Sequence, residues 1–142
     1  MSKVFASTTS FRLKIDAFDL GSFTTCSGLS AEMEMEQYAQ GGENGFVRYF
    51  PTRVKWSNLT LTRTVTTADT AKVLKWLTSL TQRVKRGTGE VVALHPNTRT
   101  IIASWDVHGI LPVRWQGPDF DSSQSKAGLE RLELAHEGLV QK

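Results

Sequence analysis

The stretch NLTLTRTVTTADTAKVLKWLTSLTQRVKR, residues 58–86, places a β-strand pattern directly before a helix pattern. In residues 58–65, Leu59, Leu61 and Arg63 alternate with threonines, as expected for a strand with one buried face. After this strand the apolar residues recur at the spacing of one side of a helix. The chain is therefore expected to combine β-structure with at least one helix.

The predicted helix covers residues 68–86 and has an apolar and a polar side. Its apolar stripe consists of Val73, Trp76, Leu77, Leu80 and Val84. Its polar face, expected to point outward, consists of Lys72, Lys75, Ser79, Gln82, Arg83 and Arg86. Thr66 or Thr67 is expected to cap the first turn, where Asp69 suits the positive end of the helix dipole. The last turn is expected to carry basic residues, and Gly87 to end the helix.

Alternating or β-rich residues elsewhere predict further strands around this helix. The predicted strands are residues 11–18, 22–27, 31–38, 46–50, 58–65, 91–95, 100–107, 110–115 and 129–137. Pro51 and Pro112 are expected to interrupt strands, and residues 40–45 and 117–128 to form polar loops. Glu and Met make a helix the rival for residues 31–38, but strict alternation favours a strand. The predicted fold class is therefore mainly β, an antiparallel α+β domain with one helix.

Length and composition are those of one globular domain, residues 1–142. Hydrophobic residues make up 39% and charged residues 22%, which excludes a disordered chain. No apolar run reaches the ~20 residues that a membrane helix needs, and the N-terminus lacks the apolar core of a secretory signal. The single cysteine, Cys26, excludes an intramolecular disulfide and indicates folding in the cytoplasm. We expect Cys26 to be buried or half-buried.

No catalytic, cofactor or metal site is predicted. The candidate metal ligands are His95, His108, His136 and Asp106. None of these histidines has a partner at ligand spacing. Glu32, Glu34 and Glu36 share one face of a predicted strand, where like charges repel unless they are solvated or paired with cations. The glycine-rich residues 40–45 lack the spacing of a nucleotide-binding loop. An enzyme is therefore not expected.

The polar face of the predicted helix gathers part of the positive charge of the chain, whose net charge is +3. Such a face could contact nucleic acid, and a small basic nucleic-acid-binding β-barrel is one alternative function. Trp76 is expected on the apolar side, however, and no aromatic residue interleaves with the cations. A solvated face or a protein partner is therefore favoured.

Four stretches carry a resemblance to a known family. They are SGLSAEMEMEQYAQGGENG (27–45), PTRVKWSNLTLTR (51–63), PVRWQGPDFD (112–121) and LERLELAHEGL (129–139). In order and spacing they resemble the inner-tube proteins of contractile injection systems and contractile phage tails, and the similarity covers nearly everything from Phe11 onward. Thr52 and Thr64 stand where this family frequently has glycine.

The resemblance implies a barrel-like domain of two packed antiparallel β-sheets with a flanking helix, similar to the Hcp protein of type VI secretion. It further implies rings of six subunits that stack into a hollow tube inside a contractile sheath, with a lumen that can hold cargo. The implied partners are further copies of the chain, the sheath, a baseplate tube initiator and terminal cap proteins. A tube initiator of the same fold is the alternative. The expected location is the cytoplasm of the producing cell, assembled into a phage-tail-like particle, without membrane insertion by the monomer.

The resemblance also implies which residues lie between rings. The residues expected in inter-ring contacts are Gly41, Gly42, Glu43, Asn44, Gly45, Arg48 and Arg53. The polar face of the helix is expected on the outside of the tube.

Overall fold

The structure, a computed structural model, describes residues 10–38, 48–95, 97–118 and 128–141. Its strands and its helix, in chain order, are β1 Ser10–Ile15, β2 Phe18–Phe23, β3 Thr25–Ser27, β4 Ala31–Tyr38, β5 Arg48–Trp56, β6 Leu59–Thr64, α1 Thr67–Gln82, β7 Gly87–Leu94, β8 Ile101–Gln116, β9 Leu129–Ala135 and β10 Gly138–Gln141. The mainly β fold with one helix that the sequence predicts is confirmed.

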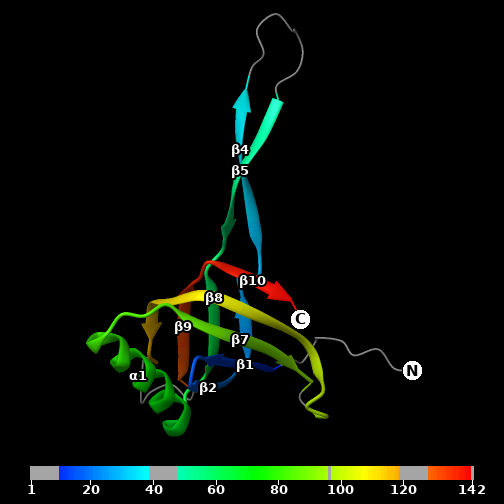
Figure 1. Cartoon of the computed structure of the whole chain (residues 1–142). Helices are drawn as coiled ribbons and strands as arrows, with labels where there is room; N and C mark the ends of the chain where they lie inside the picture. Colours follow the sequence, from blue (N-terminus) through cyan, green and yellow to red (C-terminus); the bar gives the residue numbers. More distant parts are fainter. Residues whose placement is uncertain (1–9, 39–47, 96, 119–127, 142) are drawn as a thin grey trace, which may run out of the picture.

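The strands form an eight-stranded and a two-stranded antiparallel sheet. The large sheet has the order β2-β1-β7-β8-β9-β6-β3, with β10 also paired to β8, and β4 pairs with β5. The long strand β8 pairs with β7 along its first part and with β9 along its last part, so it joins two half-sheets. At Thr24 the chain passes from β2 in one half to β3 in the other, where the Thr24 amide donates to the Thr62 carbonyl (2.8 Å). This barrel-like arrangement of two packed layers agrees with the prediction (Figure 1).

The core lies between the two half-sheets and helix α1. Its buried side chains are Leu13, Ile15, Leu20, Phe23, Leu59, Leu61, Val73, Trp76, Val91, Val107, Ile110, Leu132 and Leu134. Leu77 and Leu80 of α1 and Trp105 and Trp115 of β8 pack against this cluster and are half-buried. Burying a side chain of this size contributes about 1.5–3 kcal/mol. The alternation predicted for β6 and β9 is confirmed, because every second residue of both strands is buried.

Helix α1 is shorter than predicted. It begins after Thr66, whose hydroxyl accepts from the Asp69 amide (3.2 Å), and it ends at Gln82 instead of residue 86. Arg83 already has extended backbone angles, so the last turn carries no basic residue and Val84 is exposed. Gly87 does not end the helix but begins β7, where a Cβ atom would lie 2.6 Å from a methyl carbon of Ile15. The close approach of two strands therefore explains this glycine.

Several predicted strand boundaries are also wrong. Residues 11–18 cover most of β1 and the first residue of β2, because Asp16 turns the chain with φ 51°. Residues 22–27 are divided at Thr24, where the chain changes half-sheet. The last predicted strand, 129–137, ends at residue 135, and β10 follows as a separate strand.

Neither predicted interruption by proline occurs. Strand β5 runs through Pro51, which lies beside a bulge. Among the described strands β5 pairs only with β4, so the proline removes no hydrogen bond to a strand on the other side of β5. Strand β8 runs through Pro112 and joins residues 100–107 and 110–115, which were predicted as separate strands. Its register with β9 shifts between Pro112 and Arg114. A strand that changes its pairing partner can accommodate a proline at that point.

Candidate assembly surfaces

Strands β4 and β5 form an arm that extends away from the rest of the chain (Figure 1). The arm continues the pairing of β3 with β6, so one two-stranded ribbon leaves the large sheet. The ribbon bends at Gly28, which has φ +93° and lies against the Asn58 carbonyl. Because the arm strands pair only with each other in the described structure, both outer edges of the arm lack a neighbour.

The two faces of the arm differ in chemistry. One face, here called the Met33 face, comprises the exposed residues Met33, Met35, Gln37, Tyr49, Pro51 and Val54. The other, the Glu34 face, comprises Glu32, Glu34, Glu36, Arg53 and Lys55. Residue pairing fixes this division, because Met33 stands opposite Val54, and Glu32 opposite Lys55. At its outer end the Glu34 face continues with Tyr38 and Phe50, whose rings meet edge to face at 6.1 Å.

The Glu34 face neutralises part of its own charge. Arg53 binds Glu34 across the strands at 2.9 Å, between its Nε and a carboxylate oxygen. The bulge beside this pair leaves Thr52 without a partner residue on β4, and its hydroxyl donates to the Glu34 carbonyl (3.0 Å). Of the three glutamates that the sequence places on one face, Glu34 is paired with Arg53 and Glu32 stands opposite Lys55, whereas Glu36 stands opposite Phe50.

The base of the arm is attached to the turn between β9 and β10. The rings of Trp56 and His136 lie 5.9 Å apart, and His136 Nε2 lies 2.9 Å from the Ser57 carbonyl oxygen. Gly138 also faces the Trp56 ring, where an added Cβ atom would be in ordinary contact. These contacts fix the direction in which the arm leaves the chain.

The residues predicted for inter-ring contacts fall partly on the arm. Arg48 begins β5 opposite Tyr38 and is exposed, and Arg53 lies on the Glu34 face. The remaining predicted residues, Gly41, Gly42, Glu43, Asn44 and Gly45, lie outside the described residues. The structure thus brings Arg48 and Arg53 onto one projecting element, and their contacts with other subunits stay a prediction.

The polar face of α1 borders a surface cavity of about 600 Å³. The cavity is lined by Ala17, Phe18, Asp19, Lys72, Lys75, Thr78, Ser79 and Gln82. Asp19 binds the Arg12 guanidinium at 2.5 Å, and this hydrogen bond lowers the pKa of the Asp19 carboxyl. Trp76 is buried on the opposite side, and the aromatic residue that lines the cavity with these cations, Phe18, is half-buried against the core, whereas a nucleic-acid stacking surface needs exposed rings.

Two residues of the predicted helix face lie beyond the helix. Arg83 is the residue at which α1 ends, and Arg86 lies between α1 and β7. Arg86 binds the carboxylate of Glu137 at 3.2 Å, so it ties the end of the helix segment to the β9–β10 turn. The face on α1 itself is therefore made by Lys72, Lys75, Ser79 and Gln82.

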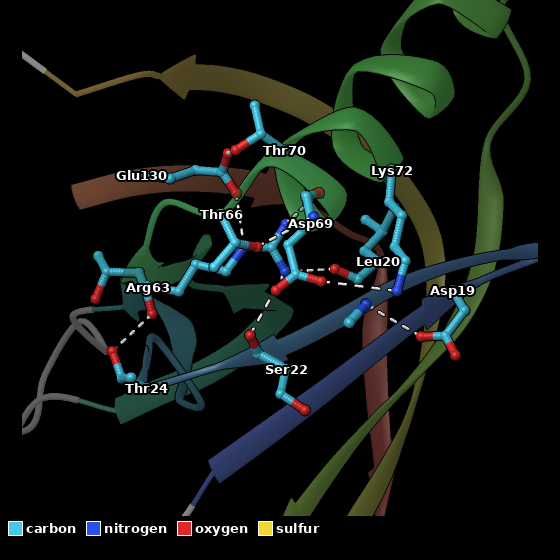
Figure 2. Close-up of polar contacts among 12 residues, drawn as sticks. Asp19, Leu20, Ser22, Thr24, Arg63, Thr66, Asp69, Thr70, Lys72 and Glu130 are labelled. Atoms are coloured by element: carbon cyan, nitrogen blue, oxygen red, sulfur yellow. Dashed lines mark hydrogen bonds and ion pairs between the residues drawn. The ribbon is translucent and has the colours of Figure 1, made fainter. Parts of the chain in front are cut away.

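A buried ion pair was not predicted from the sequence. Arg63 of β6 and Glu130 of β9 are 2% and 0% exposed and are joined at 2.7 Å. The Arg63 guanidinium also donates to the carbonyls of Leu20 and Asp69, and Thr70 donates to Glu130 (2.9 Å), as Figure 2 shows. The sequence signal was present, because alternation places Arg63 with leucines, but a single strand pattern does not identify the partner.

The Arg63 cluster connects four elements: β2, β6, β9 and the first turn of α1. The guanidinium also lies 4.1 Å from the centre of the Phe23 ring. Charged groups buried this deeply are tolerated only when they are paired and hydrogen-bonded. The cluster therefore fixes the helix against the sheet that carries the arm.

No metal site forms among the described residues, since no three His, Cys, Asp or Glu side chains gather there. The His136 ring lies tilted against the Trp56 ring at the base of the arm, and His108 is exposed on β8. Within the same described ranges, no helix is long and apolar enough to cross a membrane.

Cys26 is half-buried against the core, as predicted, and burial raises the pKa of its thiol to about 11. Since the thiolate is the reactive form, we expect the folded protein at pH 8 to react with a disulfide reagent at least about tenfold more slowly than the unfolded protein. Absorbance of the released thiol, measured with and without denaturant, checks this. Equal rates in both states would contradict the burial of Cys26.

Comparison with known proteins places these surfaces in context. Residues 7–140 match the family described as T4-like virus tail tube protein gp19. No curated protein matches the sequence.

Several solved structures have a similar fold. A chain of the anti-feeding prophage (AFP) baseplate has TM-score 0.76 and 23% identity, with 100% of this chain and 97% of that chain covered. A chain of the PVC sheath-tube complex, an extracellular contractile injection system in the extended state, has TM-score 0.74 and 18% identity over 93% and 87%. Hcp1 from Flavobacterium johnsoniae has TM-score 0.51 and 12% identity over 93% and 94%.

These likenesses confirm the predicted fold, and the family match, which spans nearly the whole chain, confirms the resemblance seen in the sequence. The chain belongs to the family of the T4-like virus tail tube protein gp19 and is a structural subunit of a tail tube.

Proposed function

We propose that six copies of this chain form a ring, and that the rings stack into the hollow inner tube of a contractile, phage-tail-like particle. Residues 1–142 act in it as one tail-tube domain. The tube is surrounded by a sheath, and contraction drives it through a target envelope. The role is structural and involves no catalysis. Assembly takes place in the cytoplasm of the producing cell.

The observation that carries this proposal is the set of strand edges without a neighbour. Within the described residues, β2 pairs only with β1, β10 only with β8, and the two arm strands only with each other. An open strand edge is a template for pairing with another chain. Edges of adjacent copies would pair around a ring into a continuous wall, which leaves no edge open.

The proposed partners are those of an inner tube that lies inside a sheath. Sheath subunits would contact the outside of the tube, where we place the polar face of α1 with Lys72 and Lys75. A similar fold in a sheath-tube complex supports this pairing. A baseplate tube initiator and a terminal cap protein would bind the two ends of the tube, and cargo would occupy the lumen.

A tube initiator of the same fold is the second candidate, because a chain of the AFP baseplate is similar over 97% of its length. Self-assembly separates the two roles. We expect the purified protein to sediment as assemblies of six copies, or multiples of six, of the 15.8 kDa chain. The size of these assemblies should increase with protein concentration. An initiator would assemble only when its baseplate partners are added.

Reversing the charges of Arg48 and Arg53 is expected to give rings that do not stack, because both residues lie on the arm that would reach the next ring. Tube length in electron micrographs is the measurement. The matched control is the charge reversal of Lys75 and Arg83, which changes the net charge equally but lies at the helix. Tubes of normal length from the Arg48→Glu, Arg53→Glu protein would remove these residues from the inter-ring contact.

A further inference from the structure

Three exposed apolar side chains of the arm, Met33, Met35 and Val54, share one of its faces, whereas Tyr38 and Phe50 lie on the other face at its outer end. Met33 and Met35 are 45% and 54% exposed, and Val54, opposite Met33, is exposed as well. On the other side of the same residues lie Glu32 with Lys55 and the ion pair of Glu34 with Arg53. The same ribbon thus offers an apolar surface and, on its reverse, a charged surface that is partly neutralised within the chain.

The described part of the chain does not cover the Met33 face. The arm leaves the body in a direction fixed by Trp56 and His136 and extends away from it (Figure 1). An isolated two-stranded ribbon is marginally stable in water. A contiguous exposed apolar surface commonly marks a protein interface. The Met33 face is therefore suited to burial against another surface.

We propose that the Met33 face of the arm docks on a second copy of this chain, whereas Glu32 and Lys55, at the base of the Glu34 face, stay in contact with water. This inference rests on the proposed function, because a tube supplies a neighbouring copy at a fixed position for every arm. The Met33 face carries no charged residue, so it selects neither nucleic acid nor an anionic membrane surface. The open edges of β4 and β5 add backbone donors and acceptors for the same copy.

Cysteine labelling on the two faces tests the proposal directly. In a Cys26→Ser background, Met33→Cys and Glu32→Cys place thiols on adjacent residues that point to opposite faces. In assembled tubes, Cys at position 33 is expected to react with a maleimide at least about tenfold more slowly than in dissociated protein, since reaction requires access to the thiol. Cys at position 32 is expected to react at similar rates in both states.

Each other outcome has a distinct meaning. Equal reactivity of position 33 in tubes and in dissociated protein would overturn the docking of the Met33 face while leaving the tube function intact. Protection already present in the dissociated protein would mean that the same chain covers this face, which also overturns the proposal. A wild-type protein that forms no ring or tube would contradict the proposed function itself, and the second copy as occupant with it.

Charge substitution gives an independent readout. Met33→Glu with Met35→Glu is expected to raise the protein concentration needed for assembly by about tenfold or more, because carboxylates would be buried without partners. The exchange Glu32→Lys with Lys55→Glu preserves the cross-strand pair and is expected to leave this concentration unchanged. Both proteins should keep the wild-type circular dichroism, since all four residues are exposed. Normal assembly of the double glutamate protein would overturn the proposal.

Discussion

Replacing Arg63 with methionine is expected to lower the free energy of unfolding by about 3–5 kcal/mol, the cost of breaking a buried ion pair from one side. The substitution leaves the Glu130 carboxylate, which is 0% exposed, without its cation. It also removes the donors to the carbonyls of Leu20 and Asp69. A loss of this size is a large part of the stability of a domain, typically about 5–15 kcal/mol. Urea denaturation followed by tryptophan fluorescence measures it.

Two comparisons make the Arg63 result specific. Arg131→Met makes the same chemical change at the next residue of β9 after Glu130, where the side chain is exposed, and should change stability by no more than about 0.5 kcal/mol. Combining Arg63→Met with Glu130→Met should restore part of the loss, because no unpaired charge stays buried. A double variant less stable than Arg63→Met alone would show that the charge of Glu130 is not the source of the cost.

Replacing Gly28 with valine is expected to cost about 2 kcal/mol or more and to misdirect the arm. Gly28 has φ +93°, a conformation that residues with a side chain rarely adopt. An added Cβ atom would overlap the Asn58 carbonyl oxygen, which belongs to the backbone and cannot move independently. We therefore expect both a lower urea midpoint and a loss of assembly, measured by sedimentation velocity.

The matched control for Gly28 is Gly138→Ala. Gly138 lies near the base of the same arm, but an added Cβ atom there would approach the Trp56 ring no closer than 3.5 Å, an ordinary contact. The alanine protein should therefore keep both its stability and its assembly. Wild-type assembly by Gly28→Val would mean that the bend at Gly28 does not determine the position of the arm.

The alternation of residue types along the sequence was sufficient to predict the strands that keep the same neighbours on each face along their length. Residues of β6 and β9 alternate between core and surface, and β4 alternates between two chemically distinct faces. The apolar stripe of the helix was equally clear, because Val73 and Trp76 pack into the core. In each of these elements one side has a constant neighbour, so the sequence period reports it directly.

Boundaries failed where distant segments decide the conformation. Pro112 was predicted to interrupt a strand, but β8 continues there because it exchanges β7 for β9 as its partner. Gly87 was predicted to end the helix, but its small size is required by Ile15 of a distant strand. Proline and glycine mark sites where the backbone is unusual. Whether such a site is a strand end, a helix end or a close contact depends on its tertiary neighbours.

The assembly surfaces were predictable in part for the same reason. Alternation divides β4 into a methionine and a glutamate face, and the family resemblance pointed to Arg48 and Arg53 on the following segment. The pairing of Arg53 with Glu34 required the register of β4 and β5, including the bulge at Thr52. The Arg63–Glu130 pair joins residues far apart in the sequence, so it could be identified only from the fold.

Electron microscopy of the purified protein in negative stain, over a range of concentrations, tests the central claim most directly. We expect six-fold rings with an open centre at low concentration and stacked tubes at higher concentration, because the open strand edges and the outer surfaces of the arms would find partners on other copies. Uniform monomers at every concentration would contradict self-assembly into a tube, and would favour an initiator that assembles only with its baseplate partners.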